Sequence, residues 1–349
     1  MNAELSRFTQ FENWCLQCAV ALGVKGQITL DSVSGDASFR SYFRFGDGVQ
    51  SYVAVNSPPA KEKNVEFVTL AKLMGDGGVK VPAVIYFDEA MGFMLLDDFG
   101  DSLLLPKLTA TTADAHYQQV IKSLLDIQQL EHSYGENFQL ASYDTKLLID
   151  EMDLFKQWFV GAMLGHNLSE QELVLIDQMF DMLVKSAQQQ PQVFVHRDFH
   201  ARNLMVLDSN KIGIIDFQDA VVGPLSYDLV SLYKDCYIHW PRHKVEQWVE
   251  EYRQLAADKL NLSVANPEVF LKQFDLMGLQ RHIKVLGVFA RLYLRDGKTG
   301  YLKDLPLVLA YVRETCRQYP EFATFDKWFE TTLQPLVAMQ DWYNAEGQV

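Results

Sequence analysis

One short segment near the middle of the chain limits its fold more than any other part of the sequence. The run His196-Arg197-Asp198-Phe199-His200 is followed by Asn203 and then by Asp216. Apolar runs before, between and after these polar residues predict strand, loop, strand, turn and strand. The three runs span residues 193–195, 204–207 and 212–215. The segment therefore presents two carboxylates and one amide from a loop and a strand end.

This set of oxygen atoms suits phosphoryl transfer from ATP. Asp198 can accept the proton of an attacking hydroxyl group. Asn203 and Asp216 supply the hard oxygen ligands that Mg²⁺ prefers, and they can hold the metal ion on the phosphates. A lone His-Arg-Asp triplet occurs by chance, and an aspartate at a strand end is often a turn residue. The order and spacing of all three residues together favour a kinase-type site.

Residues 196–203, the His-Arg-Asp loop, resemble the catalytic loop of the aminoglycoside phosphotransferase and choline kinase branch of the protein-kinase-like superfamily. The triplet Asp216-Phe217-Gln218 departs from the Asp-Phe-Gly of protein kinases, as that branch usually does. Further segments resemble bacterial anomeric sugar kinases that act on N-acetylmuramate and N-acetylglucosamine. These segments are residues 35–40, 216–220, 227–229 and 286–292. The resemblance covers most of the chain.

The resemblance implies an enzyme that phosphorylates a hydroxyl group of a small molecule, with Mg²⁺ as cofactor and ATP as co-substrate. The implied acceptor is the anomeric hydroxyl of an N-acetylated amino sugar, in the recycling of cell-wall sugars. Two alternatives stay open at this point. One is an aminoglycoside- or choline-type kinase, and the other is a kinase-like binding protein without catalysis. The sequence leaves open the choice between ATP and GTP and the oligomeric state.

The periodicity of apolar residues predicts a two-lobe α+β fold of the protein-kinase type. We expect residues 1–97 to form a nucleotide-binding lobe with a small antiparallel sheet, and residues 98–349 a mainly helical catalytic and substrate-binding lobe. In the first lobe, strands are expected at 39–45, 52–55, 83–87 and 92–96, and a helix at 61–74. In the second, helices are expected at 112–130, 144–164, 169–189, 226–237, 243–260, 267–294, 304–318 and 323–344.

The first lobe offers candidates for nucleotide binding. The backbone around Gly35 and Asp36, together with the Ser38 hydroxyl, is a candidate cover for the ATP phosphates. The same stretch also fits a simple hairpin turn. Asp97 lies in the expected hinge at residues 95–100, which makes it a further candidate contact for the nucleotide.

The strand expected after the first hairpin lacks the lysine with which kinases usually bind the α- and β-phosphates. The sugar kinases that this chain resembles also tend to lack it. Arg40 and Arg44 alternate with Phe39, Phe43 and Phe45, so the two arginines share one face of a strand. They are candidates for the missing charge. If an arginine supplies this charge, it points into the cleft, and the phenylalanines pack toward the helix of the same lobe. The alternative is a pair of solvated arginines on an edge face.

Other polar residues near these positions have two or more interpretations. Asp219 follows Asp216 closely and could reach a second metal ion, contact the substrate or cap a turn. His196 and His200 are expected to be structural, since no third ligand completes a zinc set. Asp228 lies near a helix start, where a carboxylate is favoured by the dipole. The resemblance adds that Asp228 hydrogen-bonds the backbone of the catalytic loop.

Several cations cluster along the apolar helix expected at residues 267–294. Arg291 is the candidate substrate residue among them, in a wall that binds a sugar or a carboxylate such as a lactyl group. The alternative is a solvated helix face with snorkelling side chains. The other charged residues of the cluster are Arg281, Arg295, Asp296 and Lys298, with His282 beside them.

Composition excludes some classes of protein. The chain has 349 residues and a formal net charge of −14, which argues against a general binder of nucleic acids or anionic membranes. The start has no basic segment followed by an apolar core, and no apolar run approaches the length of a membrane span. Cys15 and Cys18 fit one face of a helix and are expected to be buried thiols. Together these features predict a cytoplasmic protein.

Overall fold

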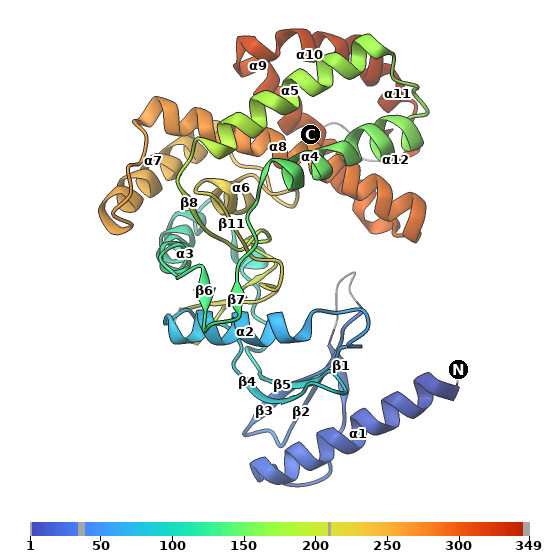
Figure 1. The fold of residues 1–349 in the computed structure, drawn as a ribbon, viewed down its shortest axis with the longest axis vertical. Helices are drawn as coiled ribbons and strands as arrows, with labels where there is room; N and C mark the ends of the chain where they lie inside the picture. The colour runs from blue at the N-terminus through green and yellow to red at the C-terminus, as the bar shows by residue number, and fades with distance from the viewer. Residues whose placement is uncertain (1, 34–38, 209–210, 345–349) are drawn as a thin grey trace. The chain divides into compact units, whose positions relative to one another are not determined.

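The computed structural model describes residues 2–33, 39–208 and 211–344, and its internal contacts divide the chain into two compact units (Figure 1). Unit 1 comprises Met1–Leu140 and Ala201–Ala220, and unit 2 comprises Ala141–His200 and Val221–Val349. Unit 1 extends past residue 97 because the backbone near Leu104 bonds to the segment after His200. The lobe boundary expected at residue 97 divides the chain at a single position, unlike these two units, and it stays a prediction.

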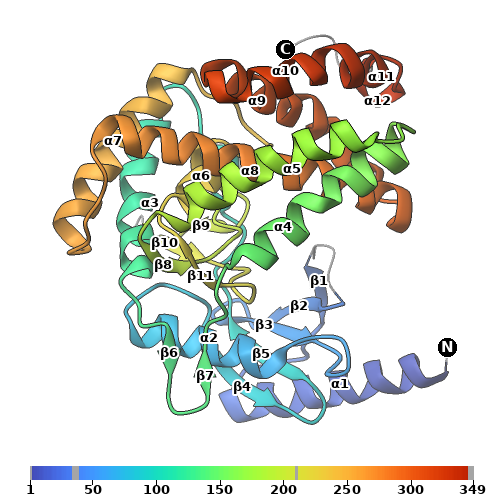
Figure 2. The same ribbon diagram turned by 45° about the horizontal axis from the view of Figure 1, so that its top comes forward.

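Unit 1 contains an antiparallel sheet whose five described strands lie in the order β1-β2-β3-β5-β4. The strands are β1 (Asp31–Val33), β2 (Ser41–Gly46), β3 (Ser51–Asn56), β4 (Val84–Asp88) and β5 (Phe93–Asp97). Helices α1 (Asn2–Leu22) and α2 (Asn64–Asp76) lie on opposite faces of this sheet, as Figure 1 and Figure 2 show. The small antiparallel sheet predicted for the first part of the chain is confirmed.

The face of the sheet under α1 is apolar. Cys15 and Cys18 of α1 are buried in a cluster with Phe45, Ala54 and Leu95. Burial raises the pKa of the two thiols to about 12 and about 11, so both stay protonated at neutral pH. The prediction of two buried thiols on one helix face is confirmed.

The predicted alternation along β2 holds only within the strand. Phe43 packs against α1 and Phe45 is buried, while Tyr42 and Arg44 face the other side of the sheet. The expectation for Phe39 was wrong, because β2 begins at Ser41 and the Phe39 ring is 60% exposed. Its ring is covered instead by the ammonium group of Lys61, in a cation–π contact.

The rest of unit 1 surrounds the hairpin of β9 (Leu204–Val206) and β10 (Ile212–Ile214). Helix α3 (Ala113–Gln128) packs against β10, and the backbone of Leu104 bonds to Leu204. A short pair, β6 (Ser133–Tyr134) and β7 (Phe138–Gln139), completes the described strands of this unit. The two strands predicted after the His-Arg-Asp loop are therefore present and paired with each other.

Unit 2 is mainly helical. Its helices include α4 (Thr145–Leu154), α5 (Glu170–Gln188), α6 (Tyr227–Tyr233), α7 (Arg242–Lys259), α8 (Pro267–Asp296) and α9 (Leu305–Gln318). Helices α4, α5, α6, α7 and α9 all pack on α8, the longest of them (Figure 2). Strands β8 (Gln192–Val195) and β11 (Val221–Pro224) form an antiparallel pair. None of the described helices combines the length and the apolar character that a membrane span requires.

The single helix predicted at residues 323–344 is broken in the structure. It consists of α10 (Ala323–Trp328), a π-helical turn (Phe329–Leu333), α11 (Gln334–Ala338) and α12 (Asp341–Asn344). Pro335 in the first turn of α11 explains the break, because proline has no N–H and its ring crowds the preceding turn. A similar π-helical stretch, Phe155–Met163, continues α4.

Gly287 allows α8 to approach α4 and the π-helical stretch closely. A Cβ atom at this position would lie 2.3 Å from the carbonyl carbon of Leu154 and 2.5 Å from the nitrogen of Phe155. Both are backbone atoms, which cannot move aside as a flexible side chain can. Gly278 of the same helix differs, because a Cβ atom there meets only ordinary contacts, with Val230 at 3.7 Å.

We expect Gly287→Ala to lower the free energy of unfolding by about 1–3 kcal/mol, because the added methyl group overpacks the contact between α8 and α4. The matched variant Gly278→Ala should be neutral or stabilising by up to about 1 kcal/mol, since alanine favours a helix over glycine. Urea unfolding followed by circular dichroism checks both. Equal stability of the two variants would show that the close approach is not a constraint.

Candidate functional site

Unit 1 contains a pocket of about 420 Å³, a volume typical of small-molecule sites. Its walls combine apolar side chains from the sheet and the β9–β10 hairpin with four aspartates. The apolar residues are Val33, Val53, Leu96, Met205 and Ile215, and the aspartates are Asp97, Asp98, Asp216 and Asp219. The predicted residues Asp97, Asn203, Asp216 and Asp219 therefore line one pocket, together with Arg44.

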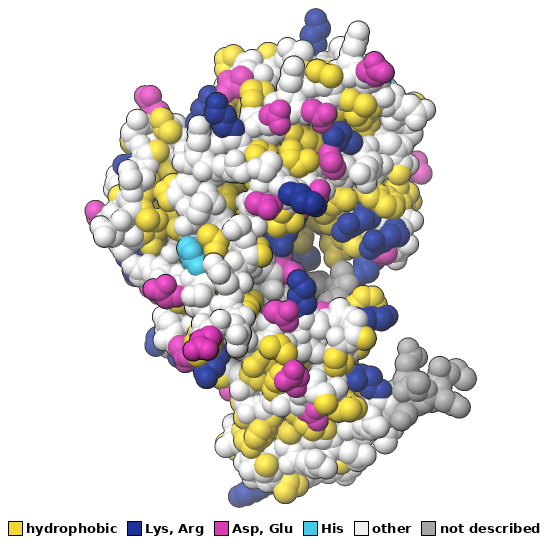
Figure 3. All heavy atoms as spheres, in the orientation of Figure 1, with side chains coloured by type: hydrophobic (Ala, Val, Ile, Leu, Met, Phe, Trp, Pro, Cys, Tyr) yellow, Lys and Arg dark blue, Asp and Glu magenta, His cyan; other side chains and the backbone are white. Residues whose placement is uncertain are grey.

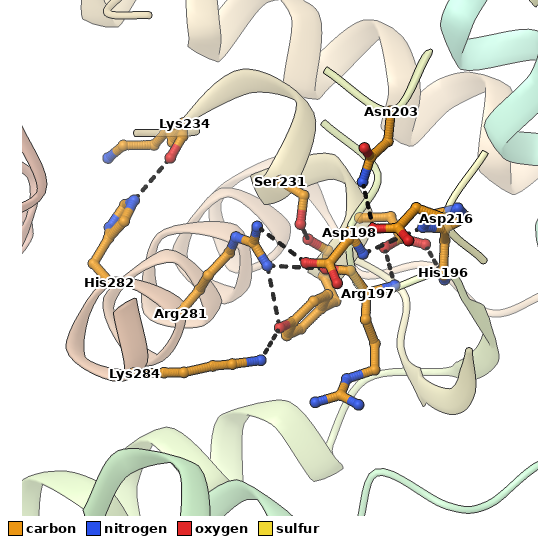
Figure 4. Close-up of polar contacts among 12 residues, drawn as sticks. His196, Arg197, Asp198, Asn203, Asp216, Ser231, Lys234, Arg281, His282 and Lys284 are labelled. Carbon is orange, nitrogen blue, oxygen red and sulfur yellow. Dashed lines mark hydrogen bonds and ion pairs between the residues drawn. The ribbon is translucent and has the colours of Figure 1, made fainter. Parts of the chain in front are cut away.

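The hairpin brings Asn203 and Asp216 together. The Asn203 amide nitrogen donates to Asp216 Oδ2 at 3.3 Å (Figure 4). Gln218 donates to the other carboxylate oxygen of Asp216 at 2.7 Å. Asp216 has a φ of 65°, in the left-handed region that a non-glycine residue occupies at a cost of about 1–3 kcal/mol. Such a strained residue at a pocket wall is typical of functional sites.

Arg44 joins β2 to the segment after β5. Its Nε and Nη2 atoms donate to the two carboxylate oxygens of Asp98 at 2.7 and 3.0 Å, and Nη1 donates to Asp101 at 2.8 Å. Asp98 is largely buried, which would raise its pKa, yet the bonds from Arg44 and Ser51 hold that pKa below its ordinary value. The charge of Arg44 is therefore already balanced by two carboxylates at the hinge.

Arg40 has a different environment, although it was predicted to share a face with Arg44. It lies just before β2 and is 4% exposed. Its guanidinium group lies over the Phe67 ring at 5.0 Å and is 3.5 Å from a carboxylate oxygen of Glu62. Phe67 in turn stacks on Phe217, the residue after Asp216, with ring centroids 4.9 Å apart. Arg40 thus lies toward the Asp216 part of unit 1 and Arg44 toward the hinge.

The remaining nucleotide candidates, Gly35, Asp36 and Ser38, lie outside the described residues. They belong to the segment between β1 and β2.

In unit 2, Asp228 at the start of α6 holds the backbone of the His-Arg-Asp loop. Its two carboxylate oxygens accept hydrogen bonds from His196 N at 2.7 Å and Arg197 N at 3.0 Å. Arg197 has a φ of 74°, so the loop turns through a left-handed residue at this point. Asp228 is completely buried, and burial raises its pKa to about 7 even though both N–H groups and Arg281 favour the charged form.

Asp198, the predicted base, follows this turn and faces two cations of α8. Arg281 Nη2 lies 3.9 Å from Asp198 Oδ1. Figure 4 shows the two side chains facing each other. Burial alone would raise the pKa of Asp198, but Arg281 and Lys284 outweigh it and hold that pKa below its ordinary value. The side chain is 41% exposed, so it remains accessible. Asp198 is therefore ionised at neutral pH and able to accept a proton.

A network of charged groups connects the loop to α4 and α8. Arg281 donates to the carbonyl oxygen of Arg197 at 2.9 Å and to the Tyr227 hydroxyl at 3.3 Å. Lys284 donates to the same hydroxyl at 3.2 Å and pairs with Glu151 of α4 at 2.9 Å. Glu151 also accepts from the Arg197 guanidinium. Burial opposes ionisation of Glu151, but Lys284 and Arg197 keep its pKa below the ordinary value.

Both histidines of the loop make contacts that are consistent with a structural role. His196 is fully buried, and its Nδ1 accepts a hydrogen bond from Asp198 N at 3.2 Å. His200 lies edge-on to the Tyr237 ring at 5.6 Å. No group of three or more His, Cys, Asp or Glu residues in the described part of the chain could hold a metal ion.

Lys284 and Glu151 were not among the predicted site residues, and Arg281 was predicted only as a member of the cation cluster on its helix. They come from helices distant in sequence from the loop, so no local pattern joins them to it. One signal in the sequence was available for Arg281, a charged residue within an apolar helix, because a buried charge needs a partner. The predicted substrate residue Arg291 lies on the same helix, α8, ten positions after Arg281.

The family model of the phosphotransferase enzyme family matches residues 29–262, about two thirds of the chain. The chain belongs to the phosphotransferase enzyme family. It is an enzyme of the kinase type, and the family resemblance stated from its motifs is confirmed.

Relatives in three bacteria, each named N-acetylmuramate/N-acetylglucosamine kinase, are similar along most of their length. The Pseudomonas putida protein is 40% identical over 84% of this chain and 86% of its own. The Pseudomonas aeruginosa protein is 38% identical over 91% and 94%, and the Neisseria meningitidis protein is 39% identical over 84% and 87%.

Solved structures share the fold at low sequence identity. A putative aminoglycoside phosphotransferase from Ralstonia eutropha has a TM-score of 0.61 and 14% identity, covering 86% of this chain and 98% of its own. Ethanolamine kinase from Plasmodium vivax has a TM-score of 0.60 and 10% identity, covering 85% and 84%. ADP-bound aminoglycoside phosphotransferase APH(2'')-Ib has a TM-score of 0.56 and 17% identity, covering 86% and 97%. The predicted two-lobe α+β kinase-like fold is confirmed.

The raised pKa of Asp228 gives a pH dependence with a defined sign. In the unfolded chain an aspartate titrates near 4, so the folded state binds the extra proton between roughly pH 4 and 7. The contribution of Asp228 to stability is therefore full below pH 4 and is lost as the pH rises through about 7. We expect Asp228→Asn, which cannot ionise, to gain stability relative to the wild type between pH 5 and pH 8.

Thermal unfolding midpoints of both proteins at pH 5 and pH 8 test this, with Asp208→Asn as an exposed control. If the difference between Asp228→Asn and the wild type stays constant over this range, Asp228 does not titrate there.

Proposed function

We propose that this kinase transfers the γ-phosphoryl group of ATP to the anomeric hydroxyl of N-acetylmuramate or N-acetylglucosamine. The observation that carries the proposal is Asp198, an ionised and accessible carboxylate fixed by the His-Arg-Asp loop. The names of relatives that are 38–40% identical over most of the chain support the choice of sugar. Recycling of cell-wall sugars in the cytoplasm is the setting that we propose with it.

In this proposal Asp198 acts as the general base that accepts the proton. As the sugar oxygen bonds to the γ-phosphorus atom and the bond to the β,γ-bridging oxygen breaks, Asp198 takes the hydroxyl proton. Arg281 keeps the carboxylate charged beforehand. Asp228, His196 and His200 keep the loop in place and do not contact the reacting atoms.

Asn203 and Asp216 fit a magnesium ion. Their side chains are adjacent, both line the unit 1 pocket, and each carries an oxygen of the hard type that Mg²⁺ prefers. Mg²⁺ usually keeps several waters and phosphate oxygens, so two protein ligands are enough. When bound, the ion would neutralise charge on the phosphates. Asp219 lines the same pocket and is proposed as a further contact to metal or substrate.

We place the nucleotide in the unit 1 pocket. Its apolar walls suit a base, and Asp97 at the end of β5 belongs to the expected hinge. The candidates for covering the ATP phosphates are still Gly35, Asp36 and Ser38. Of the two arginines, we propose Arg40 as the substitute for the usual strand lysine, because it lies over Phe67, which stacks on Phe217 beside Asp216, whereas Arg44 binds two carboxylates at the hinge.

The proposal is tested by incubating the purified chain with MgATP and measuring ADP release with a panel of acceptors. The panel contains N-acetylmuramate, N-acetylglucosamine, plain hexoses, choline and an aminoglycoside. We expect turnover with the two N-acetylated sugars. Asp198→Asn should reduce kcat by about 10²–10⁴-fold, as expected for loss of a general base, and should still bind MgATP. Asp208→Asn, an exposed aspartate near the hairpin turn, is the matched control.

Two outcomes would count against the proposal. Near-normal turnover by Asp198→Asn would show that Asp198 is not the general base. Turnover with choline or the aminoglycoside, and none with the sugars, would favour the alternative kinase classes.

A further prediction concerns the missing lysine. We expect Arg40→Ala to raise the KM for ATP by about 10- to 100-fold, which corresponds to the roughly 1.5–3 kcal/mol of a charged hydrogen bond. The KM for the sugar should change little. Arg40→Lys keeps the charge and should restore part of the affinity, while Arg44→Ala should have the smaller effect. If neither arginine alters ATP affinity, metal and backbone alone hold the phosphates.

A further inference from the structure

One face of α8 carries a row of cations that begins at the proposed base. Arg281, Lys284, Arg291 and Arg295 are spaced by three, seven and four residues, which places them on one side of the helix. In Figure 3, Lys and Arg side chains gather over the end of α8. Long side chains in a helix usually lean toward its N-terminus, which for Arg291 is the direction of Lys284 and Arg281.

Three of the four cations in this row are matched by carboxylates. Arg281 faces Asp198 at 3.9 Å, and Lys284 pairs with Glu151 at 2.9 Å. Arg295 binds both oxygens of Asp296 at 2.8 Å. These cations have their charge balanced within unit 2.

Arg291 differs from its neighbours. Among the residues that the structure describes, it has no ion pair within 4.0 Å, and its Nε atom is buried without a hydrogen-bond partner. Asp296 is near enough for Arg291 to help lower its pKa, but Arg295 occupies both of its oxygens. A partly buried guanidinium with an unused N–H donor costs free energy unless an anion binds to it.

The position of Arg291 relates it to the proposed acceptor. It lies ten residues beyond Arg281, or about 15 Å along the helix axis between Cα atoms, and a side chain that leans toward the helix N-terminus would shorten that distance. A guanidinium in that position would lie within the length of a sugar and its substituents from the Asp198 end of the row. Both proposed sugars share the ring and the N-acetyl group. N-acetylmuramate differs in its lactyl ether, which ends in a carboxylate.

We propose that Arg291 is a specificity-determining residue that binds the lactyl carboxylate of N-acetylmuramate. The planar guanidinium offers two parallel N–H donors to a carboxylate, which gives direction as well as charge. N-acetylglucosamine has no group to fill this position. The inference rests on the proposed function, because it assumes that both sugars are acceptors at the same site.

The test compares the two sugars in one variant. We expect Arg291→Gln to lower the ratio of kcat/KM for N-acetylmuramate to kcat/KM for N-acetylglucosamine by about 10- to 100-fold, as loss of a charged hydrogen bond predicts. The change should lie in the KM for N-acetylmuramate, because the carboxylate is remote from the reacting oxygen. Arg291→Lys keeps the charge without the fork and should give an intermediate ratio.

Arg317→Gln is the matched control, an exposed arginine of α9 with carboxylate partners of its own. It should leave the ratio unchanged. Turnover of N-acetylglucosamine by Arg291→Gln shows that the variant is folded. An unchanged ratio in that variant, or an equal fall in the control, overturns this inference alone. Failure of the wild type to phosphorylate either sugar overturns the proposed function instead.

Discussion

The two backbone hydrogen bonds to Asp228 are the constraint on which the unit 2 site depends. They fix consecutive N–H groups, of His196 and Arg197, and stabilise a left-handed residue that costs about 1–3 kcal/mol. The same turn sends the Arg197 guanidinium to Glu151 and presents Asp198 to Arg281. Without a buried acceptor at the start of α6, this backbone shape would leave two donors unpaired.

The charges around the loop show why local arrangement matters more than net charge. The chain as a whole carries −14, yet the surroundings of Asp198 contain Arg197, Arg281 and Lys284. Cations at short range in a partly buried site act more strongly than distant surface charges, which water and salt screen. An acidic protein can therefore present a cationic wall to a phosphorylated or carboxylated ligand.

Part of the site could be predicted because its residues are close in sequence. Asn203 and Asp216 precede and follow the two strands of one hairpin, so the pairing of β9 with β10 brings them together. Strand β11 was missed because Val221 and Val222 run into Gly223-Pro224, which is typical of a turn. The break before Pro335 was missed because an apolar helical period continues through it.

The sequence by itself determined the class of fold, the order of most of its elements and the position of the His-Arg-Asp loop, because these follow from periodicity and from short motifs. Only the tertiary structure decided which charges meet. Arg281 lies beside Asp198 although 83 positions of sequence separate them. Arg40 and Arg44 have different partners, although the alternating pattern of the sequence predicted one shared strand face for both. Ion pairs depend on distances of a few ångströms between side chains of separate elements, and the packing of those elements sets such distances.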